Sequence, residues 1–151
     1  MTTRVEKKKK NVAVTRATGE KLLAGLLSRV EEVNRGDYAY YVGAVVLFGS
    51  FLTDKERPGD IDVGVDVLQK PDFKEHAERR VRLAEARGRD FSWWNQLWWP
   101  LREVIMFLKG GSKALSIHTM PGDVYELMKD PAFQYRLLFG RLRSAPDNTH
   151  Y

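Results

Sequence analysis

The sequence contains no cysteine, and this absence removes several classes of protein. Without cysteine there is no disulfide scaffold, no cysteine-based zinc ribbon, no iron–sulfur cluster and no cysteine nucleophile. Long apolar runs are also missing, since Ala44 to Phe48 and Val104 to Leu108 fall far short of the about 20 residues that span a bilayer. No apolar segment follows the lysines near the N-terminus, so we expect no signal peptide, no membrane partner and a cytoplasmic location.

Positive charge is concentrated at the N-terminus. The net charge is +5, and among the first ten residues five are Lys or Arg and one is Glu, so the rest of the chain is close to neutral. We expect residues 1–13 to form a flexible basic tail, which is either simply solvated or adds a salt-sensitive attraction to phosphates. A length of 151 residues indicates one domain, predicted at 14–144, with a frayed tail at 145–151.

The pattern of apolar residues predicts a small α/β (α+β) domain in which a mixed sheet is packed by helices. Apolar residues make up 43% of the chain and charged residues 30%, as in globular proteins. Apolar spacing of three and four residues indicates helices, whereas alternating or continuous apolar runs indicate strands. The predicted helices are 18–36, 73–87, 101–108, 122–129 and 132–139, and the predicted strands are 38–48, 60–67 and 113–119.

One segment carries a pattern with chemical meaning. The strand predicted at 38–48 ends in Gly49 and Ser50, and nine residues later Asp60 and Asp62 begin the next predicted strand. Residues i and i+2 of a strand point to the same face, so the two carboxylates are expected to project together. Paired carboxylates suit Mg²⁺, which prefers carboxylates, water and substrate phosphates. Glycine allows the backbone to approach a phosphate closely, and a serine hydroxyl can donate to it.

Phe48, Gly49, Ser50, Asp60-Ile61 and Asp62-Val63 together resemble the signature of the DNA polymerase β-like nucleotidyltransferases. The resemblance covers about residues 38 to 68 and implies a nucleotidyltransferase fold. It also implies that Gly49 and Ser50 bind a nucleoside triphosphate, with ATP expected, while Asp60 and Asp62 act as catalytic residues that bind Mg²⁺. The small size is similar to minimal nucleotidyltransferases, many of which are antitoxins beside a HEPN-type RNase toxin. The implied acceptor is a hydroxyl of such a toxin or of RNA.

The family pattern also includes a third carboxylate on a later strand, which helps to deprotonate the attacking hydroxyl. The strand predicted at Lys113 to Thr119 contains no acid. His118 can exchange a proton near neutral pH and is a candidate base, although it can equally be a structural histidine. Asp123 can approach from the following loop, whereas Asp66 is about 13 Å along the strand from Asp62 and too far to share an ion with it. Two hypotheses stay open: an enzyme with two acids and a substitute base, or a non-enzymatic antitoxin or RNA- or protein-binding module.

All four tryptophans lie between Trp93 and Trp99. Helical spacing predicts one buried face formed by Trp94, Leu97, Trp98 and Leu101, to which Trp93 and Trp99 do not belong. The segment is therefore either core packing or a contact with an oligomer, a toxin or RNA. Nearby, arginines alternate with acids, and the i, i+4 spacing of Glu75 with Arg79 and of Glu78 with Arg82 predicts a salt-bridged, solvated helix face.

Overall fold

The structure is a computed structural model that describes residues 14–53 and 58–143, so the predicted tails at 1–13 and 145–151 lie outside the described residues. Within these ranges, no helix is long and apolar enough to cross a membrane. The elements, in chain order, are α2 (Arg16–Arg35), β1 (Tyr40–Phe48), the 3₁₀ turn η1 (Gly49–Leu52), β2 (Ile61–Gln69), α3 (Phe73–Ala86), α4 (Trp93–Lys109), β3 (Leu115–Thr119), the irregular turn η2 (Met120–Val124), α5 (Tyr125–Leu127) and β4 (Tyr135–Gly140).

The four strands form one mixed sheet in the order β3-β2-β1-β4, which confirms the predicted α+β class. β1 pairs antiparallel with β2 and with β4, whereas β2 and β3 are parallel. A parallel pair needs a long crossover connection, and here the crossover contains α3 and α4. The registers place Phe48 opposite Asp62 on β2, and Asp62 beside Ser116 on β3.

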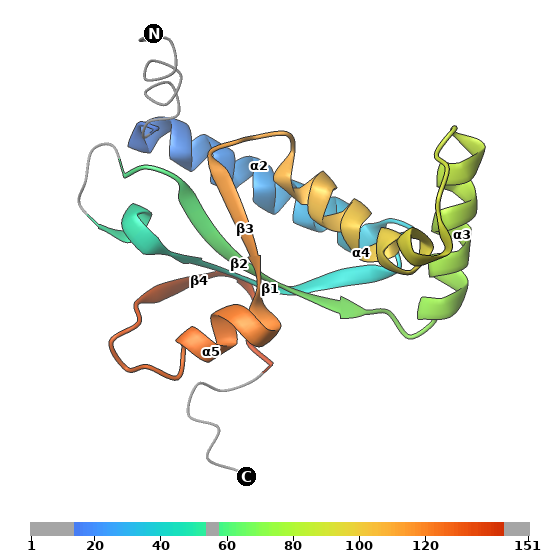
Figure 1. The fold of residues 1–151 in the computed structure, drawn as a ribbon. Coiled ribbons are helices and arrows are strands. Elements are labelled where there is room, and N and C mark those ends of the chain that lie inside the picture. Colours follow the sequence, from blue (N-terminus) through green and yellow to red (C-terminus); the bar gives the residue numbers. More distant parts are fainter. Residues whose placement is uncertain (1–13, 54–57, 144–151) are drawn as a thin grey trace, which may run out of the picture.

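The two faces of the sheet are covered differently (Figure 1). Helices α2 and α4 lie along one face, where alternate residues of the strands, such as Val45, Leu47 and Val63, form the larger core with them. The opposite face is covered by η2 and α5, which pack Met120 and Val124 against Val46, and by Phe133, Tyr135 and Leu142 from the residues after α5. Because strand side chains alternate between faces, Asp62 and His118 belong to this less covered face. Asp62 and His118 are therefore on the face away from the long helices α2 and α4.

A buried ion pair ties the C-terminal segment to this same face. Asp66 of β2 is fully buried. The Arg143 guanidinium donates to both of its carboxylate oxygens at 3.0 Å, and the Tyr125 hydroxyl donates to Oδ2 at 2.9 Å. Burial and the hydrogen bond to Asp66 raise the pKa of Tyr125, while the backbone N–H of Arg143 opposes them. Asp66 thus holds Tyr125 and Arg143, and its role is structural.

Two sequence predictions about the second half of the chain are wrong. The segment 132–139 is not a helix, because Tyr135–Gly140 forms β4 on the free edge of β1. Backbone pairing with an open strand edge outweighs local helical spacing here. Helix α4 begins at Trp93, where the side chain of Ser92 accepts a hydrogen bond from the backbone N–H of Asn95. Pro100 therefore lies inside the helix and does not begin it.

The prediction of which face of α4 is buried is also wrong. The buried residues are Trp99, Pro100, Val104 and Leu108, whereas the predicted core residues Trp94, Leu97 and Trp98 are exposed. The spacing of apolar residues did not distinguish the two faces, because both sides of the first half of α4 are apolar.

Helix α3 is attached to the protein by ion pairs that the helical spacing does not predict. Arg79 pairs with Asp37 at 2.7 Å and not with Glu75, and His76 Nδ1 lies 2.9 Å from the same Asp37 oxygen. Arg80 pairs with Glu103 of α4 at 2.7 Å. These contacts join residues distant in sequence, and one of them uses Arg79, which the i, i+4 pattern assigned to an exposed pair within the helix.

We predict that Asp66→Asn lowers the free energy of unfolding by about 2–3 kcal/mol, because the charge that strengthens the hydrogen bonds to Arg143 and Tyr125 is lost. Urea unfolding measures the change. Asp72→Asn is the matched control, since Asp72 is exposed and its side chain makes no cap hydrogen bond. Equal losses in the two variants would contradict the structural role of Asp66.

The hydrogen bond from Arg79, followed by weaker help from His76, lowers the pKa of Asp37 from 3.8 to about 2, against a smaller opposing effect of burial. A folded-state pKa below the unfolded value stabilises the protein above about pH 4, and this stabilisation is lost as the pH falls toward 2. Asp37 is half exposed, so the contribution is at most about 1 kcal/mol. NMR titration of the Asp37 carboxyl should show its pKa rising toward the usual value in Arg79→Gln and rising less in His76→Ala. An unchanged pKa in Arg79→Gln would refute this account.

Candidate functional site

The candidate site begins where β1 ends. Gly49 has a φ of 81°, in the left-handed region that favours glycine, and a Cβ atom at this position would lie only 2.6 Å from Asp62 Oδ2. Both observations have one cause, since the register pairs Phe48 with Asp62 and the chain turns sharply at the next residue. The Gly49 backbone therefore lies directly against the Asp62 carboxylate, and no larger residue fits there without a shift. The sequence patterns assigned Gly49 and Asp62 to one candidate site, but they did not predict this direct contact between the two residues.

Ser50 follows in η1 and is engaged within the protein. Its hydroxyl donates to the carbonyl of Pro58, across the segment that leads to β2. Arg16 at the start of α2 donates to the carbonyl of Phe51 at 2.8 Å and to that of Thr53 at 2.6 Å. These hydrogen bonds fix the turn after β1, so the position of Gly49 is supported from both sides.

His118 of β3 contacts Asp62 directly. Its Nε2 atom lies 3.2 Å from Asp62 Oδ1 and 3.2 Å from Ser116 Oγ. On its other side, Nδ1 lies 3.8 Å from Asp123 Oδ2, and the ring packs 5.3 Å from that of Phe48. The parallel register produces this arrangement, because Asp62 is beside Ser116 and the next residues on that face are Gly64 and His118. The imidazole therefore lies between two carboxylates.

The predicted site residues are thus only partly brought together. Gly49, Asp62 and His118 meet, and Asp123 approaches from η2 as the sequence allowed. Asp60 lies just before β2, which begins at Ile61, so strand alternation does not fix its direction. It is exposed, and no residue within 14–53 or 58–143 makes a hydrogen bond or ion pair with it.

Ser116 is the contact that the sequence analysis missed. Its signal was available, because Ser116 and His118 are two residues apart in a predicted strand and share a face. Gly64, which lies on the same face of β2, affects the site through the packing of η2. A Cβ atom there would lie 2.9 Å from Val124 and 3.0 Å from Val46, so the glycine allows η2 to pack closely against the sheet. That close packing carries Asp123 toward His118.

The donor set of the site suits a hard cation. Asp62 is about one-third exposed, and Asp60 is exposed, so both carboxylates are accessible to an ion. Carboxylate oxygens are the ligands that Mg²⁺ takes together with water and phosphate. The part of the chain that the structure describes contains no group of three or more His, Asp or Glu residues arranged to hold a metal. The fit to Mg²⁺ therefore rests on the two aspartates and on groups that a substrate supplies.

Comparisons of the chain with protein-family models, with curated proteins and with solved structures found no match.

We predict that Gly49→Ala destabilises the protein more than Gly111→Ala. Gly111 has a similar φ of 77°, but a Cβ atom there would meet nothing within 4 Å. The control should therefore show only the cost of a left-handed alanine, about 1–2 kcal/mol. The excess loss at Gly49, measured by urea unfolding, reports the contact with Asp62 and should shrink when both variants are made in an Asp62→Ala background. An excess that persists in that background would show that Gly49 meets something else.

Proposed function

We propose that the chain is a Mg²⁺-dependent nucleotidyltransferase. It moves a nucleoside monophosphate from a nucleoside triphosphate, with ATP the expected substrate, to a hydroxyl group of a protein or RNA acceptor. The observation that carries the proposal is the contact between the Gly49 backbone and the Asp62 carboxylate, on the less covered face of the sheet. A side-chain-free turn beside an accessible carboxylate provides room for phosphates next to a metal ligand.

Each residue has a distinct role in this mechanism. Asp60 and Asp62 would hold Mg²⁺, which neutralises charge on the triphosphate and on the departing pyrophosphate. Gly49 admits the phosphates, and the Ser50 hydroxyl donates to one of their oxygens after it leaves the Pro58 carbonyl. That hydrogen bond is the contact within the site that has to change when nucleotide binds.

His118 is the residue placed to receive the proton of the attacking hydroxyl. The acceptor oxygen forms a bond to the α-phosphorus, pyrophosphate leaves, and the hydroxyl proton passes to an imidazole nitrogen. The Asp62 carboxylate 3.2 Å from Nε2 orients the ring, and the Asp123 carboxylate lies 3.8 Å from Nδ1. In this way an imidazole between two carboxylates takes the place of an acid on β3.

A second candidate function is a domain that binds nucleotide without efficient transfer and acts as a non-enzymatic antitoxin or as an RNA- or protein-binding module. The contact between Asp62 and His118 is the observation that favours this second function. Asp62 Oδ1 already has His118 as its partner, and β3 contributes no carboxylate to the face that bears the site. A site with a pre-formed Asp–His pair can hold a nucleotide and yet lack a group that activates the acceptor.

Thermal unfolding with ATP, CTP, GTP and UTP, each with and without Mg²⁺, tests both functions. A ligand at 100 times its dissociation constant stabilises the native state by about 2.7 kcal/mol, which raises the melting temperature measurably. We expect a Mg²⁺-dependent rise with ATP in the wild type, lost in Asp60→Asn and in Asp62→Asn and kept in Asp72→Asn. His118→Gln retains both carboxylates and should keep the rise while losing transfer.

Transfer is followed with ATP labelled at its α-phosphate. Label that moves to protein or RNA in the wild type, and not in Asp62→Asn, supports the enzyme. A Mg²⁺-dependent thermal shift without transfer to candidate acceptors favours the binding module. The absence of any shift with all four nucleotides at millimolar concentration would refute the enzyme and favour a module that binds RNA or protein without a nucleotide.

A further inference from the structure

The first half of α4 exposes a row of large apolar side chains. Trp93 is 70% exposed, Trp94 58%, Leu97 55% and Trp98 53%. The rings of Trp93 and Trp94 are 5.8 Å apart, and those of Trp94 and Trp98 are 6.2 Å apart, so they form one continuous surface. We call Trp94 and Trp98, which are one helical turn apart, the Trp ridge.

This surface is as large as the largest apolar patch of a typical monomer, about 300–600 Å², which is often a functional site. An aromatic side chain buries up to about 250 Å² in a core or interface, so three tryptophans more than half exposed offer on the order of 450 Å². Monomeric proteins rarely show apolar patches above a few hundred Å², and such patches mark interaction sites. A standard interface covers about 800 Å² on each partner, so the three rings alone supply over half of it.

A groove runs beside the Trp ridge, between α3 and α4. Its volume is about 370 Å³, and its walls include Phe73, Ala77 and Val81 of α3 and Leu97 and Pro100 of α4. Trp93 also lines it, so the groove is continuous with the exposed row. On the exposed side of α4, a concave apolar surface, the groove, therefore lies next to a convex one, the Trp ridge.

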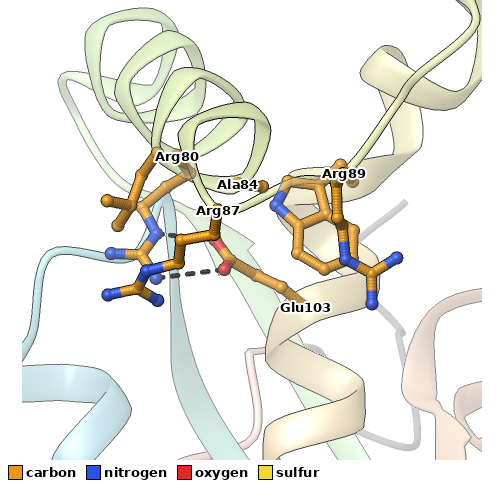
Figure 2. Close-up of a pocket in the computed structure, with 7 residues that line it drawn as sticks. Arg80, Ala84, Arg87, Arg89 and Glu103 are labelled. Carbon is orange, nitrogen blue, oxygen red and sulfur yellow. Dashed lines mark hydrogen bonds and ion pairs between the residues drawn. The ribbon is translucent and has the colours of Figure 1, made fainter.

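The two helices that form the groove are also joined by contacts of residues that do not line it. Figure 2 shows Arg80 of α3 joined to Glu103 of α4, with two hydrogen bonds of 2.7 and 3.0 Å. The Arg80 guanidinium lies 4.5 Å above the Tyr38 ring, and that of Arg89 lies 4.4 Å above Trp99. Because both helices are held before any partner arrives, docking in the groove costs little ordering of the protein.

The charges around the groove indicate which kind of partner fits. Lys74 and Glu78 both line it, and arginines alternate with glutamates along the exposed side of α3. A phosphate chain requires an excess of positive charge, which this surface does not have. The groove is also about 25 Å from Gly49, because Tyr40 contacts Phe73 at one end of β1 and Gly49 follows the other end. The surface therefore suits a protein partner of mixed charge and is separate from the candidate site.

We propose that this surface joins two copies of the chain about a twofold axis, with the Trp ridge of each copy in the α3–α4 groove of the other. A twofold contact uses one surface twice, so the surface must match itself. Here the convex ridge and the concave groove lie side by side on the same surface, and the lysine and glutamate at the groove can each meet their opposite in the second copy. The dimer buries both ridges and leaves both candidate sites open.

The tryptophans provide a direct measurement on the wild-type protein. All four lie in the Trp93 to Trp99 segment, so tryptophan emission reports on this surface and its surroundings alone. Light scattering after gel filtration, from about 1 to about 200 µM, should give twice the 17.4 kDa mass of one chain at the upper end. Dilution should lower the mass and shift the emission to longer wavelength together, as the ridge returns to water.

Variants locate the contact. Trp94→Ala with Trp98→Ala should weaken association by about 100-fold or more, since buried tryptophans dominate interface energies. Met106→Ala is the matched control, because Met106 is 46% exposed on the same helix and does not line the groove. Both proteins are checked for an unchanged melting temperature of the monomer. A wild type that stays monomeric throughout, a dimer with unchanged emission on dilution, or a dimer that survives loss of both ridge tryptophans would overturn the proposal.

Discussion

The register between β1 and β2 is the constraint on which the rest of the structure depends. It places Phe48 opposite Asp62, and the next residue, Gly49, therefore turns against the Asp62 carboxylate. A slip of one residue would send every side chain of a strand to the opposite face, which would bury Asp62 under the helices and expose Val63. The larger core under α2 and α4 and the candidate site on the other face are thus two results of one pairing.

The uneven covering of the sheet explains why polar residues of β2 and β3 are tolerated on one face. Beneath α2 and α4 the strands contribute apolar side chains to the larger core, whereas η2 and α5 cover part of the opposite face. Along that face β2 carries Asp62, Gly64 and Asp66 in turn. Asp62 stays accessible, Gly64 allows η2 to approach, and Asp66 is buried but neutralised by Arg143. Three residues on the same face of one strand therefore have three different roles, which depend on what packs against each of them.

Local patterns predicted the parts of the structure that local interactions determine. Continuous apolar residues identified β1, alternation identified β2 and β3, and the distance between Asp62 and Asp66 correctly separated these two acids. The predictions were wrong where contacts between segments distant in sequence determine the structure. Residues 135–140 form a strand because β1 has a free edge, and the buried side of α4 depends on where α3 and the sheet lie. No spacing within α3 could have shown that Arg80 pairs with Glu103.

The sequence predicted the part of the candidate site that β1, β2 and the turn between them form. The prediction was incomplete for the part that β3 contributes. Gly49 and Asp62 followed from two short motifs, but the contact of His118 and Ser116 with Asp62 required the parallel register of β3. That register also bears on the chemistry. Ser116 is the residue beside Asp62 across the two parallel strands, and His118, two residues further along the same face, lies 3.2 Å from Asp62 Oδ1. An acid at this position would add a carboxylate ligand beside Asp62, whereas an imidazole can take up a proton and carries no negative charge. Under the proposed function, the histidine would supply proton transfer at this position and would provide less negative charge than a carboxylate to hold a second cation.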